Sequence, residues 1–590
     1  MYAGSFEATL QLRGPVVSHS SAVGGYGIDT VMARTRDENG QERYYLAGTL
    51  IKGRLGEAWQ ELGRQDWRDD FLGLASPGGE EGGRNLPRRG TVFFGDFVDG
   101  KTATGASCTR FRVRIDEQMG SVQHGMVQVI ESPWRSGEPV TFVGTVRVLA
   151  ENGDKAAEVR GAVERGLNWI AAAGAEQSAG FGRLEKVHCG DLEERRPPAT
   201  IIAGDAVEMA ITPTEPFCLA LRRIAKNMFG SSEVIPGGAV KGVVAEMLKL
   251  RGAEYSELSD NLYAIRFLHA FPAKLEKKRP EVLPLSLAIV PADKTRIYNA
   301  VHDWLAIEAL EPAFDVDWKD QDRARVYAAF GLESADMELR VRTAIEGEAR
   351  RAKDEDLFGY RMAVPHGFRW CGGVSFAGVP ELKRGIVARQ LQELLAMGLF
   401  GLGKTKAWAK VECAPTAGAV VRGRADGRII VTLQTAALLL NPGRLGADVS
   451  MDAVKKEYET VWNLELGDGS VELEDLYFQR TALAGGGYFR HRFQHDLQYR
   501  PFLLTEAGSV FVLRVRNADV AAAKAKEWLI HGLPIPKGAR SFYYLRDGEE
   551  STWWDHCPFV RENGYGEVSV NSALHDWASH DLKEDGDVRE

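Results

Sequence analysis

An aspartate that closes a glycine-rich run is the chain's best candidate for catalysis: Asp29 ends the sequence Gly24-Gly25-Tyr26-Gly27-Ile28-Asp29. A carboxylate in such a loop can coordinate Mg²⁺ beside a phosphate, or help a ribose 2′-hydroxyl attack the phosphate next to it. His19 precedes Asp29 on the same loop and could contact a phosphate or assist proton transfer. An aspartate beside glycines also commonly forms a turn, and a lone histidine is commonly structural. Both interpretations therefore stay open at this point.

A second pattern places a lysine just inside a helix that opens from a glycine turn. Lys52 follows Gly48-Thr49-Leu50-Ile51, and Lys241 follows Gly237-Gly238-Ala239-Val240. Backbone N–H groups at such a turn bind phosphate oxygens, and a lysine adds a point charge to that cradle. Because the pattern occurs twice, the chain contains a repeated module.

Glycine loops recur at the other end of each repeat, between an amphipathic stretch and a strand. They are Gly180-Phe181-Gly182-Arg183, Gly401-Leu402-Gly403-Lys404 and Gly564-Tyr565-Gly566. Such loops let a sugar-phosphate chain approach closely, and Phe181 could stack on a base. The alternative is that the glycines form tight turns and the aromatic residues belong to the core. Three loops imply about three modules, which suits a chain of 590 residues.

Composition limits the class of protein. With 44% hydrophobic and 26% charged residues, the chain is an ordinary globular protein with several cores. The net charge of -9 argues weakly against a nucleic-acid partner, although local basic clusters set the local field. Such clusters lie at residues 84–89, 274–279, 350–353 and 490–492.

Cysteine usage and the N-terminal sequence indicate a compartment. The 6 cysteines lie far apart, without a C-x-x-C pair or metal-type spacing, which is typical of a reduced intracellular protein. The first residues resemble no signal peptide, and no stretch is apolar enough to span a membrane. We expect a cytoplasmic protein without a membrane partner or an organic cofactor.

Hydrophobic periodicity predicts the fold class. Residues 6–12 alternate like a strand, 49–62 form a helix, 110–131 form a hairpin, 139–149 form a strand, and a helix and a last strand follow. This order predicts an α+β chain of three fused ferredoxin-like (βαββαβ, RRM-like) modules with insertions. We name them module 1 (1–195), module 2 (200–415, with a helical insertion) and module 3 (425–575), followed by an acidic tail (576–590).

Five segments of module 1, taken in order, resemble the RAMP superfamily of CRISPR-associated proteins, specifically the backbone subunit of type III effectors. They are residues 25–29, 48–55, 114–121, 137–142 and 180–183. Residues 201–570 resemble the tandem-RAMP subunit of type III-D complexes more loosely. Residues 221–232 of module 2 carry no acid at the place that corresponds to Asp29.

The resemblance implies a guide-RNA-binding subunit of a type III CRISPR ribonucleoprotein that serves antiviral defence. Its partners would be CRISPR guide RNA, target single-stranded RNA and other effector subunits. Module 1 would act as an endoribonuclease and cut the target once through Asp29, with Mg²⁺ as an open candidate cofactor. The 110–131 hairpin would project as a thumb, with Met119 or Val122 wedged between bases. The predicted RNA contacts are His19, Ser20, Gly25, Lys52, Arg54, Gly180, Phe181, Gly182, Arg183, Lys241, Gly401, Gly403, Lys404 and Arg490.

Two other functions compete with this one. The chain could be a non-catalytic RNA-binding scaffold or capping subunit of the same kind of complex. It could also be an endonuclease that processes guide precursors, which would need a working histidine near a glycine loop, and His188 is the nearest example. An exposed Asp29 beside an RNA path would favour target cleavage, whereas an Asp29 bonded inside its own loop would favour the scaffold.

Overall fold

The structure is a computed structural model. It describes residues 1–19, 27–37, 39–74, 88–102, 108–116, 118–195, 201–225, 227–250, 253–346, 351–416, 418, 421–446, 449–494 and 497–582. Within these ranges, the side chains of 221–223, 225, 343–346 and 351–356 are not described.

Module 1 is built on a sheet with the order β11-β1-β10-β7-β3-β2, in which neighbours run antiparallel. Its four main strands, taken along the chain, occupy the order 4-1-3-2 with a helix after the first and third, which is the ferredoxin-like arrangement. These elements are β1 (Tyr2–Arg13), α1 (Gly48–Glu61), β7 (Phe97–Thr102), β10 (Pro139–Ala150), α3 (Gly153–Trp169) and β11 (Arg183–Cys189).

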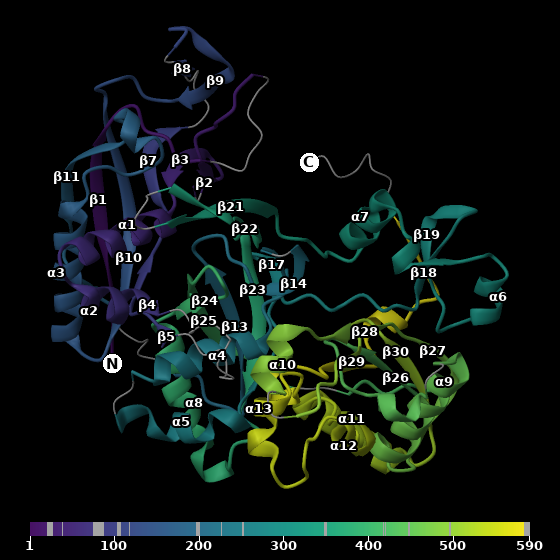
Figure 1. The fold of residues 1–590 in the computed structure, drawn as a ribbon. Coiled ribbons are helices and arrows are strands. Elements are labelled where there is room, and N and C mark those ends of the chain that lie inside the picture. Colours follow the sequence, from purple (N-terminus) through teal and green to yellow (C-terminus); the bar gives the residue numbers. More distant parts are fainter. Residues whose placement is uncertain are drawn as a thin grey trace.

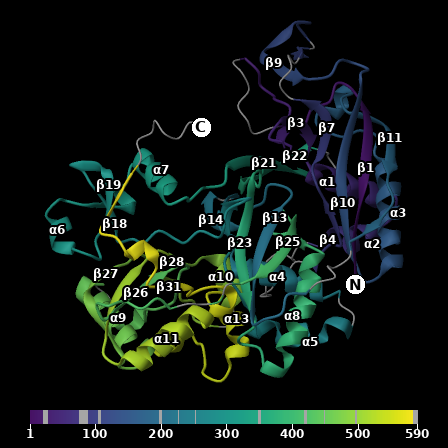
Figure 2. The same cartoon turned by 180° about the vertical axis from the view of Figure 1, so that it is seen from behind.

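Shorter elements complete module 1, and one of them leaves the sheet. The hairpin β8 (Cys108–Ile115) and β9 (Val122–Ser132) stands away from the rest of the module in both views (Figures 1 and 2). The others are β2 (Arg34–Arg36), β3 (Glu42–Leu46), α2 (Gln65–Trp67), β4 (Gly73–Leu74), β5 (Arg88–Arg89), β6 (Val92–Phe94) and β12 (Glu193–Glu194).

Module 2 repeats the strand order in a sheet arranged β16-β23-β13-β25-β24. All of its neighbouring strands are again antiparallel. Its elements are β13 (Ala206–Pro213), α4 (Gly237–Leu248), α5 (Ser256–Asn261), β16 (Arg266–Phe267), β17 (Phe271–Lys274), β23 (Phe368–Ser375), α8 (Glu381–Ala396), β24 (Leu399–Leu402) and β25 (Ala407–Pro415).

The insertion in module 2 contains short helices and, in addition, two sheets that the prediction of a helical insertion did not include. Every residue of Leu287–Val290 is buried, and a continuous apolar run of this length is typical of a central strand. One inserted sheet contains β18 (Leu287–Val290), β19 (Asp293–Asn299) and β20 (Ala313–Phe314), with the short helices α6 (Trp304–Glu308) and α7 (Asp320–Ala329). A second sheet contains β14 (Ala220–Ala225), β15 (Met228–Ser231), β21 (Met337–Glu346) and β22 (Arg351–Ala363).

Module 3 has the antiparallel order β27-β30-β26-β31, which is once more 4-1-3-2. The α+β, ferredoxin-like fold class is therefore confirmed. Its elements are β26 (Arg428–Leu433), α9 (Met451–Thr460), β27 (Val471–Phe478), β28 (Thr481–Ala484), α10 (Gly487–Phe493), β29 (Phe502–Thr505), β30 (Val510–Val515), α11 (Ala518–His531), α12 (Lys537–Phe542), α13 (Trp553–His556) and β31 (Val568–Val570).

The expected acidic tail is folded over its first residues. β32 (Ser579–Asp581) pairs with β19 of the module 2 insertion, and Trp577 stacks on Phe330 at 5.7 Å. An aromatic side chain and a strand edge therefore anchor the start of the acidic tail, although Ser579–Asp581 stay exposed. Residues 583–590 lie outside the described residues.

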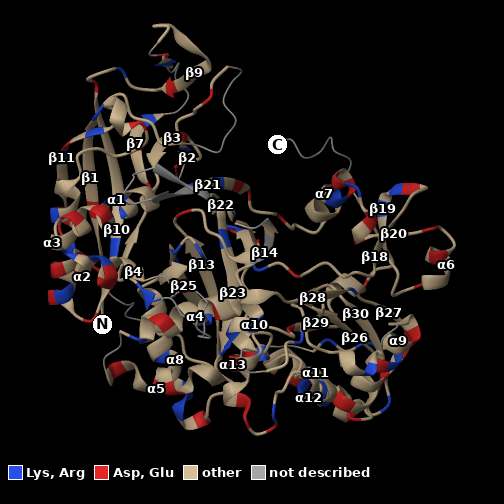
Figure 3. Cartoon of the chain, viewed as in Figure 1, with Lys and Arg blue, Asp and Glu red and all other residues tan. Residues whose placement is uncertain are grey.

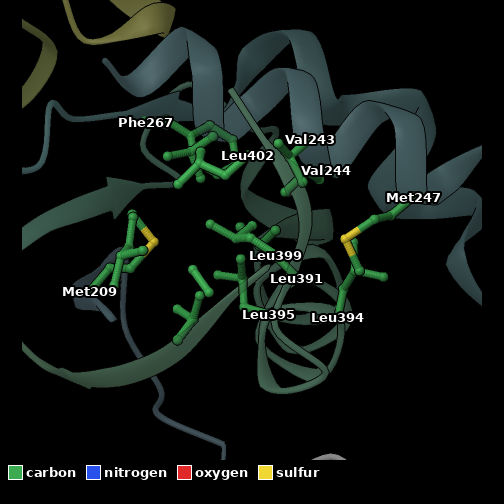
Figure 4. Packing of buried hydrophobic residues seen from close by; sticks show 14 of the residues in the cluster. Met209, Val243, Val244, Met247, Phe267, Leu391, Leu394, Leu395, Leu399 and Leu402 are labelled. Atoms are coloured by element: carbon green, nitrogen blue, oxygen red, sulfur yellow. The ribbon is translucent and has the colours of Figure 1, made fainter. Parts of the chain in front are cut away.

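Close helix packing shows why the sequence folds as it does. In α3, Asn152 caps the first turn by accepting from the Lys155 N–H at 2.9 Å, and Val159, Val163 and Leu167 face the core. Gly166 lies where α3 meets Leu55 and Trp59 of α1, so a side chain there would clash with both. Figure 4 shows the corresponding packing in module 2, where Val243, Val244 and Met247 of α4 face Leu391, Leu394 and Leu395 of α8.

Modules 1 and 2 share one core. The module 2 cluster includes Ala3, Phe93 and Leu149 from module 1. Arg147 and Arg195 of module 1 lie over the Trp408 ring at 4.5 and 5.0 Å. The two modules therefore bury apolar surface against each other in the same way as two halves of one domain. Among the described helices, none is long and apolar enough to cross a membrane.

Candidate nucleic-acid interface

Asp29 is exposed, and it is bonded to the projecting hairpin. Its carboxylate Oδ2 accepts from the backbone N–H of Val129 in β9 at 2.6 Å. Its own backbone N–H donates to the Val129 carbonyl at 2.9 Å. The carboxylate is thus held at the base of the hairpin and still faces solvent.

Buried polar contacts next to Asp29 fix the same segment. Glu131 is only 3% exposed, and its carboxylate accepts from the Met32 N–H at 2.9 Å and pairs with Arg34 at 2.6 Å. Gln128 donates to the Thr30 hydroxyl at 3.0 Å. Because β9 is bonded to Asp29 and to the residues that follow it, this segment and the hairpin hold each other in place. No motif distinguishes Glu131 in the sequence, because it lies in an otherwise ordinary strand.

The β8–β9 hairpin presents large apolar side chains to solvent. Phe111 is 70% exposed and Met119, at the turn, is 78% exposed; Val113, Ile115, Val122 and Met126 are also exposed. Arg110, Arg112 and Arg114 alternate with them, so the hairpin has one apolar and one basic face. The predicted hairpin is confirmed, and a two-stranded ribbon with no core on either face is typical of a surface that binds a partner.

His19 is joined to the segment that carries Asp29, because it pairs with Met32, three residues after Asp29. His19 forms an isolated antiparallel bridge with Met32, which precedes β2. Partial burial lowers the pKa of His19 below its ordinary value, although the residue still reaches solvent. Ser20 and Gly25, two further predicted contacts, lie outside the described residues.

The two repeated lysines point inward. Lys52 donates to the Leu72 carbonyl at 2.9 Å, and Lys241 donates to the carbonyls of Tyr263 and Ile265, each at 3.0 Å. Burial lowers the pKa of Lys52, and it lowers the pKa of Lys241 to about 8. Both ammonium groups cap the carbonyl end of a following helical turn, so the geometry assigns Lys241 a structural role in place of the predicted RNA contact.

The first glycine loop is only partly open. Gly180 is exposed in a left-handed conformation with φ 83°, and Arg183 is exposed at the start of β11. Phe181 is partly buried and packs against the module 1 core, which favours the alternative that it is a core residue. Gly182 is buried and donates to the Pro15 carbonyl at 2.8 Å.

The second glycine loop lies at the junction of modules 1 and 2. Gly401 is buried, and Arg89 of module 1 donates to its carbonyl at 3.1 Å. A side chain at Gly403 would clash with the Cys218 carbonyl. These glycines allow close protein packing, and their contact with RNA stays a prediction.

Cations gather around this junction. The position of a Cβ on Gly401 lies 3.1 Å from Arg89 Nη1 and 3.8 Å from the Lys406 Cδ. Burial lowers the pKa of Lys406 to about 8, with further lowering by Arg89, Lys52 and Lys404. Lys404 is exposed, and its ammonium lies 4.3 Å from the Phe229 ring centroid. Mutually repelling cations of this kind favour an anion such as a phosphate. The sequence predicted Lys404 as an RNA contact. It gave no sign of Lys406, which lies two residues further along the chain.

The remaining predicted RNA contacts differ in how exposed they are. Arg54 pairs with Glu57 on its own helix and is partly buried. Arg490 is exposed on α10, where Tyr488 is 61% exposed. His188 is exposed on β11. Charges of both signs are interspersed over all three modules (Figure 3), so any RNA path follows local clusters and not one basic face.

Among the described residues, no three His, Cys, Asp or Glu side chains gather as a metal site. Mg²⁺ is commonly held by one or two carboxylates together with substrate phosphates and water. Asp29 is exposed and could supply one such ligand, so the residues present are compatible with a magnesium ion that arrives with its RNA.

Among solved structures, 190 chains match, and the two reported below have low TM-scores. No protein-family model and no curated protein matches the chain. A chain of the Type III-B Cmr-beta complex bound to cognate target RNA and AMPPnP has a TM-score of 0.28 and 14% identity, covering 52% of this chain and 86% of that chain. A chain of Type III-B Cmr-beta bound to cognate target RNA has a TM-score of 0.22 and 14% identity, covering 32% of this chain and 61% of that chain. Likenesses of this size assign neither a family nor an activity to the chain.

Proposed function

We propose that this chain is a guide-RNA-binding subunit of a type III CRISPR effector ribonucleoprotein, and that module 1 cuts target RNA at one position through Asp29. The observation that carries the proposal is the placement of Asp29: exposed, and held by Val129 at the base of the β8–β9 hairpin. A scaffold has no need to fix an exposed carboxylate in this way. The sequence resemblance to RAMP proteins supplies the expected substrate.

The hairpin supplies the register. Exposed Met119 and Phe111 can enter between bases and unstack them, which costs a few kcal/mol per step and is offset by apolar contact. Phe111 is paired with Val129 across the hairpin, so a base step unstacked by Phe111 would bring its phosphate near Asp29. A single intercalating side chain and a single catalytic carboxylate would therefore produce a single cut in the target RNA.

The chemistry uses the carboxylate as a base. Asp29 Oδ1, to which no described residue donates, accepts the proton of a ribose 2′-hydroxyl. The 2′-oxygen attacks the adjacent phosphorus, and the bond from phosphorus to the 5′-oxygen breaks. The 5′-oxygen takes a proton from water, which leaves a 2′,3′-cyclic phosphate and a 5′-hydroxyl. A bound Mg²⁺ would stabilise the phosphate charge.

The junction cations supply the binding. Lys404, Lys406 and Arg89 stand together where modules 1 and 2 meet, and an RNA strand that crosses the junction would neutralise them. The arginine and lysine head groups contact backbone phosphates and carry no sequence preference, as a guide of variable sequence requires.

Cleavage of end-labelled target RNA by the assembled complex tests the function. We expect Asp29→Ala to remove one specific cut and to leave guide and target binding unchanged. A target with a single 2′-deoxy substitution at that position should be equally resistant. If Asp29→Ala cuts everywhere at the wild-type rate, the chain is the alternative, a non-catalytic scaffold or capping subunit.

A further inference from the structure

The two junctions between modules are built alike. At each one, an arginine of the upstream module donates to a carbonyl in the last turn of the second helix of the downstream module. Arg195 Nε donates to the Ala396 carbonyl of α8 at 3.0 Å, and Arg266 Nη1 donates to the Ile530 carbonyl of α11 at 3.1 Å. A cation at a helix C-terminus is favourable because the last carbonyls are unpaired.

The glycine loop that follows each helix is contacted from the same side. Arg89 donates to the Gly401 carbonyl at 3.1 Å, and Arg266 Nε donates to the Arg561 carbonyl, just before Gly564, at 3.2 Å. A ring pair accompanies each arginine: Phe93 with Phe400 at 5.5 Å, and His269 with Tyr565 at 4.7 Å. Arg89 lies just before the second strand of module 1, and Arg266 is the first residue of β16, the second strand of module 2.

The space around the first glycine of each loop shows whether a neighbouring module covers that loop. A Cβ on Gly401 would lie 3.0 Å from Phe93, and a Cβ on Gly564 would lie 2.5 Å from His269 Nδ1. A Cβ on Gly180 of module 1 would meet no described atom within 4 Å. The same surface is therefore covered in modules 2 and 3 and open in module 1.

The open surface of module 1, formed by Trp169 and residues 178–181, has the features of an unoccupied junction. Trp169 is the last residue of α3 and is 53% exposed. Its indole N–H donates to Glu61 at 2.9 Å, which fixes the ring. An exposed, pre-ordered tryptophan beside an open helix end is the kind of side chain that anchors a protein interface.

The other end of the chain does not supply the matching half. Residues 461–475 lead into and begin the second strand of module 3, and they contain no lysine or arginine. Glu465, Glu472 and Glu474 stand there instead. Module 3 therefore has no arginine to offer to module 1 of a second copy, and modules 1 and 2 already use theirs internally.

We propose that the surface formed by Trp169 and residues 178–181 binds a ferredoxin-like module of a different polypeptide, which presents an arginine from just before or at the start of its second strand. The chain then extends an assembly in one direction and ends it at module 3. The inference rests on the protein junctions alone, so it holds whether or not module 1 cuts RNA.

Site-specific photocrosslinking of the full chain in its native host tests the proposal. A benzoylphenylalanine at position 178 should form an adduct with another protein, and peptide mapping should place it beside an arginine just before or at the start of the second strand of a ferredoxin-like module. The same probe at position 382, which is fully exposed on α8, is the matched control and should give no such adduct. An adduct with RNA or with a second copy of this chain, or no adduct, would overturn the proposal.

A second variant separates anchoring from folding. Trp169→Ala should lower the adduct yield at position 178 by about tenfold or more, with the thermal unfolding midpoint of the purified chain nearly unchanged. An unchanged yield contradicts the assignment of Trp169 as the anchor. Light scattering of the purified chain should report a monomer, and a head-to-tail oligomer that Trp169→Ala disrupts would show that the occupant is a second copy.

Discussion

The Asp29 carboxylate accepts a hydrogen bond of 2.6 Å from the backbone N–H of Val129, so the loop that carries the acid and the hairpin that would set the register are joined at one point. Module 2 has a related joint, where β15 pairs in parallel with β22. No acid stands at the corresponding place in residues 221–232. The same architecture thus appears with and without a candidate catalytic group.

Removing the donor at Val129 should misplace the acid without removing it. Val129→Pro deletes the N–H that holds Asp29, and this N–H points away from β8, so the hairpin pairing should survive. We expect target cleavage to fall by about 10- to 100-fold, because positioning contributes that much at a loosely held group. Val129→Ala, which keeps the N–H, is the matched control. Equal cleavage rates for the two variants would show that the bond has no catalytic role.

Lys241 should prove structural. Lys241→Ala leaves the carbonyls of Tyr263 and Ile265 without their donor, so we expect a loss of about 1–3 kcal/mol in the free energy of unfolding. Guide-RNA affinity, measured by filter binding below the melting temperature, should not change. A weaker affinity with unchanged stability would restore the phosphate contact that the sequence suggested.

The junction cations should account for part of the salt dependence of RNA binding. Lys406→Gln and Lys404→Gln each remove one charge near Gly401. The slope of log affinity against log salt should become shallower by about 0.7 for each phosphate of a single strand that the variant no longer neutralises. Lys526→Gln, on α11 of module 3, serves as a control of equal charge. Identical slopes for all three variants would place the RNA elsewhere.

The sequence predicted the parts of the fold that depend on local pattern. Hydrophobic alternation and the glycine loops located the strand-helix repeats and the β8–β9 hairpin, because both depend on residues that are close together in the sequence. The inserted sheet was missed, since its strands pair across long distances and even recruit residues 579–581 from the C-terminus. In the candidate site, Asp29 was found from its loop, but Glu131 and Lys406 act through tertiary contacts that no local motif records.

Acid should destabilise the junction of modules 2 and 3. Burial lowers the pKa of His269 and His575 to about 4, below the ordinary 6.5. The unfolded chain takes up these protons near pH 6.5 and the folded chain only near pH 4, so stability is full above pH 6.5 and is lost as the pH falls toward 4. Each histidine contributes up to about 3 kcal/mol over this window. Urea unfolding at pH 7 and pH 5 measures it, and a double His→Asn variant should show a flatter pH dependence. Equal pH slopes would contradict this origin.

The single-turnover cleavage rate of Asp29→Asn in the assembled complex tests the central claim most directly. The asparagine carbonyl can still accept from the Val129 N–H, so the loop, the hairpin and RNA binding should be preserved. The amide cannot accept a proton from the 2′-hydroxyl, and we expect the rate at the module 1 cut to fall by at least about 100-fold, in the range typical for loss of a general base. Cuts at other positions of the complex should be unaffected. A wild-type rate at the module 1 cut, with RNA bound as tightly as before, would show that Asp29 does not carry the chemistry.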